Sequence, residues 1–220
     1  MNYQEMSNNK LVLTGEVLEP PVYSHELFGE GFYETKLQVM RLSKQFDIVP
    51  ITISERLIKL YNIEVGKNIT IEGQFRSYNK IEEEKSKLML TAFVRDIVEK
   101  DEENPNSIEL TGFICKAPIY RTTPFKREIC DVLLAVNRAY NKSDYIPCIF
   151  WGRNARFIKN MQIGEKISLS GRVQSRNYTK IASDNTVIEH VAYEVSVNKI
   201  MIDKPLQISL QVRDIANYEQ

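Results

Sequence analysis

Two aromatic side chains, Tyr145 and Trp151, are spaced so that they fall on one side of a β-strand in the second half of the chain. The other side of this strand is apolar over residues 146–150, and so is the equivalent side of a related strand at residues 49–53. The side that stays apolar in both strands is the one that faces a core, so Tyr145 and Trp151 are expected to point outward. Outward aromatic rings can stack on flat, ring-shaped ligands.

The next strand, over residues 166–178, places cations beside these rings. Its inward positions are apolar, whereas its outward positions carry Arg172, Gln174, Arg176 and Tyr178. Aromatic rings stack on nucleobases for about 1–3 kcal/mol per base, and arginines neutralise the phosphates between the bases. One such aromatic alone is more often a packing residue. Together with two arginines, the three rings indicate a surface that binds single-stranded nucleic acid.

These strands belong to an internal repeat that defines the domains. Residues 13–15, 37–41 and 47–50 recur 97 positions later, and residues 76–80 match residues 176–180 after small insertions. We therefore predict a first domain at 1–97 and a second at 107–202. An acidic linker at 98–106 is expected to join them without entering either core, and a C-terminal extension at 203–220 alternates as a further strand would.

Charge and composition narrow the class of protein. The chain has 29 Lys and Arg and 29 Asp and Glu, yet residues 107–202 hold 14 against 8. Such a basic domain suits a polyanionic partner, although a surplus of cations also occurs on ordinary solvated surfaces. The three cysteines and two histidines show no metal-ligand spacing, so we expect reduced core cysteines, no metal and no cofactor. No membrane span or signal is evident, and a cytoplasmic, nucleoid-associated protein is expected.

The fold class follows from the order of the elements in each copy. Short alternating segments predict five strands, and residues 153–161 and the stretch around Leu57–Tyr61 predict a short helix between the third and fourth. This order is that of an oligonucleotide-binding (OB) fold, a five-stranded Greek-key barrel. We therefore predict an all-β protein with short helices and two tandem OB-fold barrels. A plain β-sandwich is the rival fold.

Residues 134–138 (LAVNR), 144–153 (DYIPCIFWGR) and 171–178 (GRVQSRNY) resemble bacterial single-stranded-DNA-binding protein over the whole second domain. The resemblance implies base stacking by Tyr140, Tyr145, Trp151 and Tyr178, and roles in DNA replication, recombination and repair. Tandem-OB members of that family build four barrels from two chains, which implies a homodimer. With the cations, the expected nucleic-acid-binding residues are Arg138, Tyr140, Tyr145, Trp151, Arg172, Arg176, Tyr178 and Lys180.

The first copy departs from this pattern. It has Ser43, Ile48 and Ser54 where the second copy has aromatics, and residues 82–84 add three glutamates. A degenerate barrel that binds DNA weakly or not at all is therefore expected. The binding set that it keeps consists of Arg41, Arg76, Tyr78 and Lys80.

Other functions compete with this interpretation. The C-terminal residues lack the long acidic tail of the family, so partners among replication or repair proteins are not indicated. No recognisable catalytic motif is present, so we expect no enzyme, with a metal-dependent nuclease as the enzymatic alternative. The stronger rival is a primosome-type or plasmid- or phage-borne OB module that binds proteins and only weakly binds nucleic acid. RNA is a further possible ligand.

Overall fold

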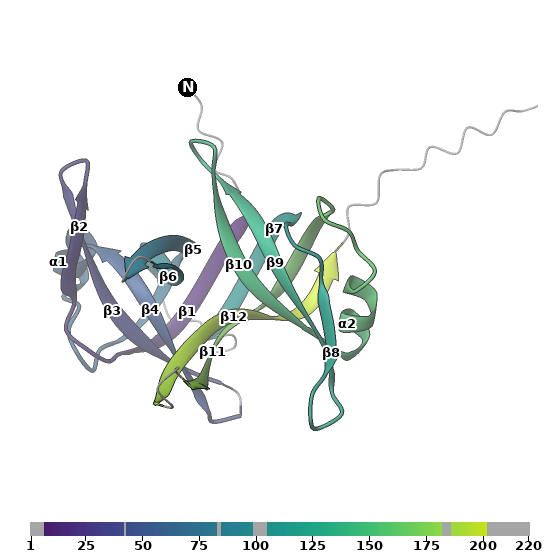
Figure 1. Ribbon diagram of the computed structural model, residues 1–220. Helices are drawn as coiled ribbons and strands as arrows, with labels where there is room; N and C mark the ends of the chain where they lie inside the picture. The colour runs from purple at the N-terminus through teal and green to yellow at the C-terminus, as the bar shows by residue number, and fades with distance from the viewer. Residues whose placement is uncertain (1–6, 42, 83–84, 99–104, 182–185, 202–220) are drawn as a thin grey trace, which may run out of the picture.

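The computed structural model of the chain describes residues 7–41, 43–82, 85–98, 105–181 and 186–201. Two barrels lie side by side, and we call residues 7–98 the first barrel and 105–201 the second (Figure 1). The first barrel contains β1 (Asn9–Val17), β2 (Val22–Leu27), β3 (Glu30–Met40), β4 (Phe46–Ser54), α1 (Glu55–Tyr61), β5 (Asn68–Glu82) and β6 (Lys85–Val98). The second contains β7 (Asn106–Ile114), β8 (Ile119–Thr122), β9 (Glu128–Arg138), β10 (Lys142–Trp151), α2 (Gly152–Ile158), β11 (Lys166–Ile181) and β12 (Val187–Met201).

The strands of each barrel pair in the order of an OB fold. In the second barrel β7 pairs with β11, β11 with β12, β12 with β10, β10 with β9, and β9 returns to β7. The first barrel closes in the same way through β1, β5, β6, β4 and β3. The predicted tandem OB fold is confirmed, because a sandwich would leave two separate sheets instead of closed barrels.

Two details of the predicted elements were wrong. A sixth short strand, β2 or β8, pairs with the second barrel strand, and it was missed because its side chains are largely exposed and show no apolar alternation. The second helix ends at Ile158 and not at Met161. Met161 still packs against the core, which explains why it fitted the helical spacing.

The predicted linker is shorter than expected at its C-terminal end. Asn106 begins β7. Its side-chain NH₂ donates to the carbonyl oxygen of Val173 at 2.8 Å, and its side-chain oxygen Oδ1 accepts from the Val173 N–H. The carbonyl of Pro105 accepts a hydrogen bond from the Thr14 N–H. Residues 105 and 106 therefore belong to the fold. Residues 99–104 and the extension at 203–220 lie outside the described residues.

The barrels join through an antiparallel pairing of β1 with β7, which merges their strands into one sheet. This pairing centres on Leu11 and Ile108, which are equivalent residues of the repeat. Contacts on either side recur in matched pairs, because Asn9 bonds the backbone of Phe75 just as Asn106 bonds that of Val173. The two barrels are thus related by an approximate two-fold axis between β1 and β7.

A second set of matched contacts crosses the junction. The Asp47 carboxylate accepts the Ser175 N–H at 2.7 Å, and the Ser175 hydroxyl accepts the Ile48 N–H. Asp144 and Tyr145 make the same two bonds to Ser77. Ser77 and Ser175 are therefore equivalent residues of the repeat, and so are residues 76 and 174. The sequence alignment that matched Arg76 with Arg176 was wrong.

Within the described ranges, no helix is long and apolar enough to span a membrane.

Candidate nucleic-acid interface

The predicted outer face of the second barrel is present on β10. Ile146, Cys148 and Phe150 are buried in the core, whereas Tyr145 is 45% exposed and Trp151 is half-buried. Ile149 alternates with Tyr145 and Trp151 on the outer side of the strand, yet its side chain is buried. It lies mid-strand between Asp131 of β9 and Ser196 of β12, so both neighbouring strands flank it.

Trp151 is held by a neighbouring strand. Its indole N–H donates to the Ser196 hydroxyl at 3.2 Å. At the equivalent position of the first barrel, Ser54 caps α1 by accepting the Leu57 N–H, whereas Trp151 makes no side-chain cap to α2. The second barrel therefore has an indole where the first has a helix cap.

Three predicted residues of β11 come together around one ring. The Arg176 guanidinium lies 5.8 Å and the Lys180 ammonium 5.7 Å from the centre of the Tyr178 ring. Tyr178 also stacks on His190 of β12, with ring centres 5.3 Å apart and an interplanar angle of 24°. The stack orients the phenol ring, and two cations next to a flat ring suit a base with its phosphates.

This part of β11 borders a cleft between the barrels of about 440 Å³. Its lining includes Pro147, Tyr178 and His190 of the second barrel and Leu88 and Leu90 of β6 in the first. Glu194 also reaches it and accepts from the Gln174 amide at 2.6 Å, with Arg176 3.8 Å away. Since Glu194 is engaged by these two side chains, its charge is partly compensated.

Arg172 lies elsewhere than predicted. Its guanidinium reaches across the junction to Asp47 at 3.5 Å and donates to Gln174, and burial lowers its pKa. Arg41 binds the same carboxylate from within the first barrel, because its Nε donates to Asp47 at 2.6 Å and this hydrogen bond raises the pKa of Arg41. Its guanidinium also donates across the junction to the Ser175 carbonyl at 3.5 Å. Both arginines thus hold the junction together, and the outer face contains Arg176 and Lys180 without Arg172.

Arg138 and Tyr140 lie on the hairpin between β9 and β10. Tyr140 and Asn141 adopt left-handed backbone angles, with φ of 61° and 54°, as a tight hairpin turn requires. The Tyr140 ring is 76% exposed at this tip. Arg138 pairs with the buried Asp144 at 3.3 Å, and burial raises the pKa of that carboxyl.

The first barrel retains Arg76, Tyr78 and Lys80 on β5, but it also has an aromatic that sequence reasoning missed. Phe93 of β6 lies under the Arg76 guanidinium, which is 3.7 Å from its ring centre. In the parallel pairing of β4 with β6, Phe93 lies next to Thr52. Ser196 occupies the equivalent position in the second barrel, where it lies next to Ile149. The large and small side chains are therefore swapped between two equivalent positions. The first barrel has Ser54 and Phe93, and the second has Trp151 and Ser196.

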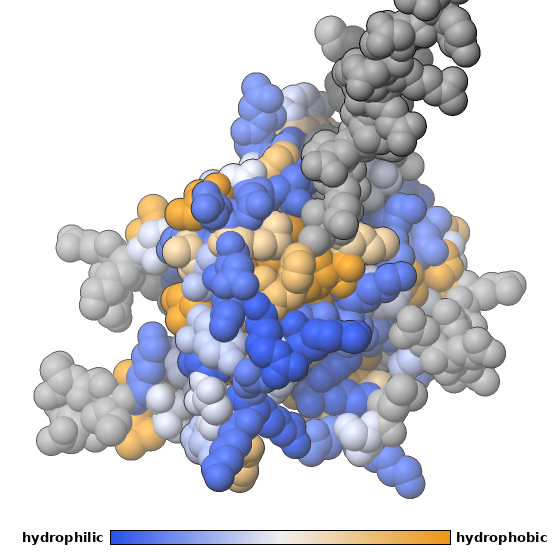
Figure 2. All heavy atoms as spheres, turned by 90° about the vertical axis from the view of Figure 1, so that its right-hand side faces the viewer, coloured by the Kyte–Doolittle hydropathy of each residue, from blue (hydrophilic) through white to orange (hydrophobic). Residues whose placement is uncertain are grey.

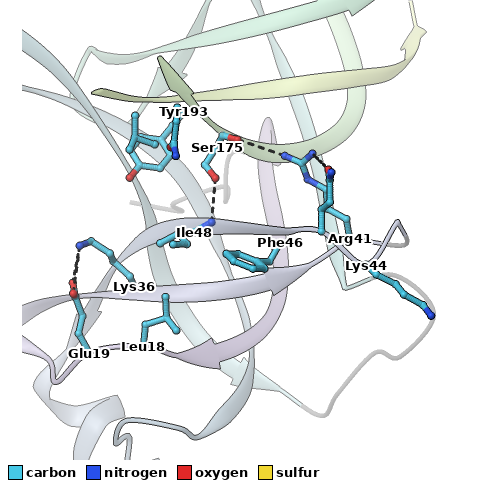
Figure 3. A pocket seen from close by; sticks show the side chains of 12 residues that line it. Leu18, Glu19, Lys36, Arg41, Lys44, Phe46, Ile48, Ser175 and Tyr193 are labelled. Atoms are coloured by element: carbon cyan, nitrogen blue, oxygen red, sulfur yellow. Dashed lines mark hydrogen bonds and ion pairs between the residues drawn. The ribbon is translucent and has the colours of Figure 1, made fainter. Parts of the chain in front are cut away.

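The outer face of β3 and β4, where Ile48 replaces an aromatic, forms one wall of a cavity of about 750 Å³ against the second barrel. Ser43 lies in the turn between these strands and does not line the cavity. Figure 3 shows Leu18, Phe46 and Ile48 along this wall, with Tyr193 facing them from β12. Lys36 at its edge pairs with Glu19 at 3.1 Å. Charged and polar side chains make up the rest of this wall, and Phe46 is its one aromatic ring among the described lining residues.

The expected core cysteines are partly confirmed. Cys130 and Cys148 are buried, and burial raises the pKa of each thiol, to about 11 for Cys130. Cys115 is only half-buried and donates to the Leu133 carbonyl. Among the residues that the structure describes, no cluster of three His, Cys, Asp or Glu side chains could hold a metal ion.

Comparisons with known proteins agree with this geometry. Residues 105–200 match the single-strand binding protein family. A single-stranded DNA-binding protein of Clostridium tetani (strain Massachusetts / E88) is 37% identical over 100 residues, which cover 41% of this chain and 68% of that protein. Single-stranded DNA-binding protein 1 of Staphylococcus aureus (strain COL) is 36% identical over 80 residues, 33% of this chain and 48% of its own length. The chain belongs to the single-strand binding protein family.

The chain spans about half the length of the Staphylococcus aureus relatives that it matches. Among solved structures, a deletion variant of the single-stranded DNA binding protein from Thermus aquaticus superposes with a TM-score of 0.66 at 17% identity. The match covers 90% of this chain and 97% of that one, so it includes both barrels. At this level of identity it shows that the two share a fold.

Proposed function

We propose that this chain binds single-stranded DNA without sequence preference, mainly through the outer face of the second barrel. The observation that carries the proposal is the cluster of Tyr178 with Arg176 and Lys180 on β11. Tyr178 lines the same cleft as Pro147 of β10, which lies on the side of that strand that also carries Tyr145 and Trp151. Stacking on aromatic rings tolerates any base, and cations between the rings neutralise phosphates. Protection of exposed single strands in replication, recombination or repair is the role that such binding serves.

Binding without catalysis is the proposed activity. The chain's membership of the single-strand binding protein family supports it, as does the naming of its relatives as single-stranded DNA-binding proteins. A cytoplasmic location is proposed with it, since the proposed ligand is the single-stranded DNA that replication, recombination or repair exposes.

We also propose that two chains associate into a homodimer with four barrels. The short strands β2 and β8 lie at the two ends of the strand order, so each has an edge that the described part of the sheet does not cover. Exposed edges of this kind are commonly protected by pairing. Large apolar side chains, Val22 and Ile119, are exposed on them. On the side of the molecule that carries β8 and α2, apolar surface is visible among hydrophilic side chains (Figure 2).

The fluorescence of Trp151 tests the DNA-binding proposal directly, because it is the only tryptophan of the chain. Adding oligo-dT should strongly quench its emission, whereas a duplex of the same length should not, since paired bases cannot stack on the indole. Raising the salt concentration should weaken binding with a log–log slope of about −0.7 per phosphate contacted. If anisotropy shows binding while the emission stays unchanged, Trp151 is not part of the site.

A further inference from the structure

A third groove at the junction brings together residues that the sequence had assigned to separate barrels. It has a volume of about 780 Å³, within the range of ligand sites, and includes Arg76, Tyr78 and Phe93 of the first barrel. From the second barrel it includes Arg138 and Tyr140, on the hairpin between β9 and β10. This set of side chains, together with Phe28 and Lys142, is called the junction groove below.

Two exposed aromatic tips flank the junction groove. Phe28, at the turn between β2 and β3, is 96% exposed and has a φ of 52°. Tyr140 is at the tip of the β9–β10 hairpin, across the groove from Phe28. The β2–β3 and β9–β10 hairpins project from the same side of the molecule (Figure 1). A phenylalanine held almost wholly in water gains no stability from burial, so its place beside a groove suggests contact with a ligand.

The charges in the junction groove favour an anion. Three cations line it, Arg76, Arg138 and Lys142, against one carboxylate, Glu34, within the described lining. Burial, with the repulsion of Arg138 as the next cause, lowers the pKa of Arg76 to about 10. The Asp144 carboxylate, 3.3 Å from Arg138, offsets part of this repulsion, and a phosphate between the two guanidinium groups would stabilise both further.

The floor of the junction groove is already arranged for stacking. Arg76 covers one face of Phe93 at 3.7 Å, and Phe93 in turn packs near Phe32 with ring centres 5.5 Å apart. Tyr78 beside it is 41% exposed, so its ring is accessible from the groove. An outward aromatic on β6 thus takes the place of the one that the first barrel lacks at Ser54.

We propose that the junction groove is a second site for the same single strand, in which a phosphate lies between the arginines of the two barrels and bases stack on Tyr78, Tyr140 and Phe28. The inference rests on the proposed DNA binding and extends it to the first barrel. It replaces the expectation that the first barrel contributes little, because the wall of the groove on that side belongs to β5 and β6.

Phe28→Ala tests the inference, and Phe125→Ala is its matched control. Phe125 follows Phe28 by the 97 residues of the repeat, is 87% exposed at the equivalent hairpin tip and does not line the groove. Both side chains lie at the surface, so neither variant should unfold the protein. With oligo-dT of about 30 nucleotides, long enough for two OB folds, Phe28→Ala should bind about tenfold more weakly, and Phe125→Ala should bind like the unaltered protein.

Lys142→Glu tests the charge, with Lys126→Glu at the tip of the β8–β9 hairpin as its control. Loss of one phosphate contact should flatten the log–log salt slope by about 0.7 for Lys142→Glu alone. Ultraviolet crosslinking of bound oligo-dT should also attach thymine to the peptides that contain Phe28 or Tyr140.

The outcomes separate this inference from the proposed function. If Trp151 is quenched by oligo-dT but Phe28→Ala and Lys142→Glu bind like the unaltered protein, the junction groove is not a DNA site and the outer face of the second barrel remains one. Equal losses in Phe28→Ala and Phe125→Ala also overturn the groove, because they would reflect hairpin tips in general. Absence of any binding by the unaltered protein would remove the proposed function itself.

Discussion

Tyr178 shows how one side chain of the proposed site is prepared for a ligand. Its ring is already oriented by His190, and the cationic groups of Arg176 and Lys180 both lie within 6 Å of its centre. A ring fixed before binding loses little conformational freedom when a base stacks on it, so more of the stacking energy remains for affinity. All three of these contacts involve the ring of Tyr178 and not its hydroxyl.

We therefore expect Tyr178→Ala to weaken binding of single-stranded DNA by about 1–3 kcal/mol, the usual loss for one stacked base. Tyr178→Phe keeps the ring and should bind within a factor of about two of the unaltered protein. Quenching of Trp151 measures both affinities. If the phenylalanine variant loses as much as the alanine variant, the hydroxyl and not the ring makes the contact.

The residues that sequence reasoning placed correctly and wrongly differ in a physical way. Parity identified Tyr145 and Trp151 as outward because the inward side of the same strand is apolar in both copies. Parity cannot tell whether an outward residue meets water or another domain, which is why Arg172 was expected on the open face. Phe93 was missed because an isolated phenylalanine in an apolar strand has no mark that separates outward from core positions.

At the scale of elements, two glycines bend the long strands that carry the site. Gly73 and Gly171 each occupy the irregular step in the pairing of the fourth and fifth barrel strands. A Cβ at either position would lie about 2 Å from a backbone carbonyl oxygen, 2.1 Å from that of Phe93 or 2.2 Å from that of Ser196. The repeat of these glycines was visible in the sequence, but the close approach that requires them was not.

Gly171→Ala should accordingly lower the free energy of unfolding by about 3 kcal/mol, at the upper end of the usual cost of overpacking, because the clash is with backbone. Ser170→Ala, one residue earlier on the same strand, should change it by less than about 1 kcal/mol. Urea denaturation followed by circular dichroism gives both values. A Gly171→Ala protein as stable as the unaltered one would show that β11 can shift away from β12.

The exposed strands β2 and β8 show where element prediction reaches its limit. Apolar alternation finds strands with one buried face, and it found the five that close each barrel. The side chains of β2 are exposed throughout and those of β8 nearly so, so these strands are held mainly by their backbone bonds to β3 and β9. A strand with no buried face has no periodic signal to read.

At the scale of the molecule, the two barrels are joined by matched contacts of unequal strength. Asp47 is fully buried, receives Arg41 and the Ser175 N–H, and has Arg172 at 3.5 Å. Its counterpart Asp144 has Arg138 at 3.3 Å and the Ser77 N–H. Asp47 therefore compensates two cations at the junction, whereas Asp144 has one ion-pair partner among the described contacts.

Asp47→Ala should cost about 3 kcal/mol of unfolding free energy, the lower end for a broken buried ion pair, because Arg41 and Arg172 keep some contact with water. Asp144→Ala should cost less, since one cation is left unpaired and not two. Urea denaturation measures the difference. If Asp144→Ala proves the more costly change, the β10 side of the junction and not the β4 side holds the barrels together.

The proposed homodimer follows from what the two barrels leave uncovered. Pairing of β1 with β7 uses one pair of edges, whereas β2 and β8 still lie at the ends of the strand order with exposed apolar side chains. Light scattering at micromolar concentration should give about twice the chain mass of 25.6 kDa. The mass should persist in high salt, because strand pairing and apolar contact are not screened as ion pairs are. A monomer that still binds single strands tightly would contradict the four-barrel assembly and leave the pair of barrels in one chain as the complete binding unit.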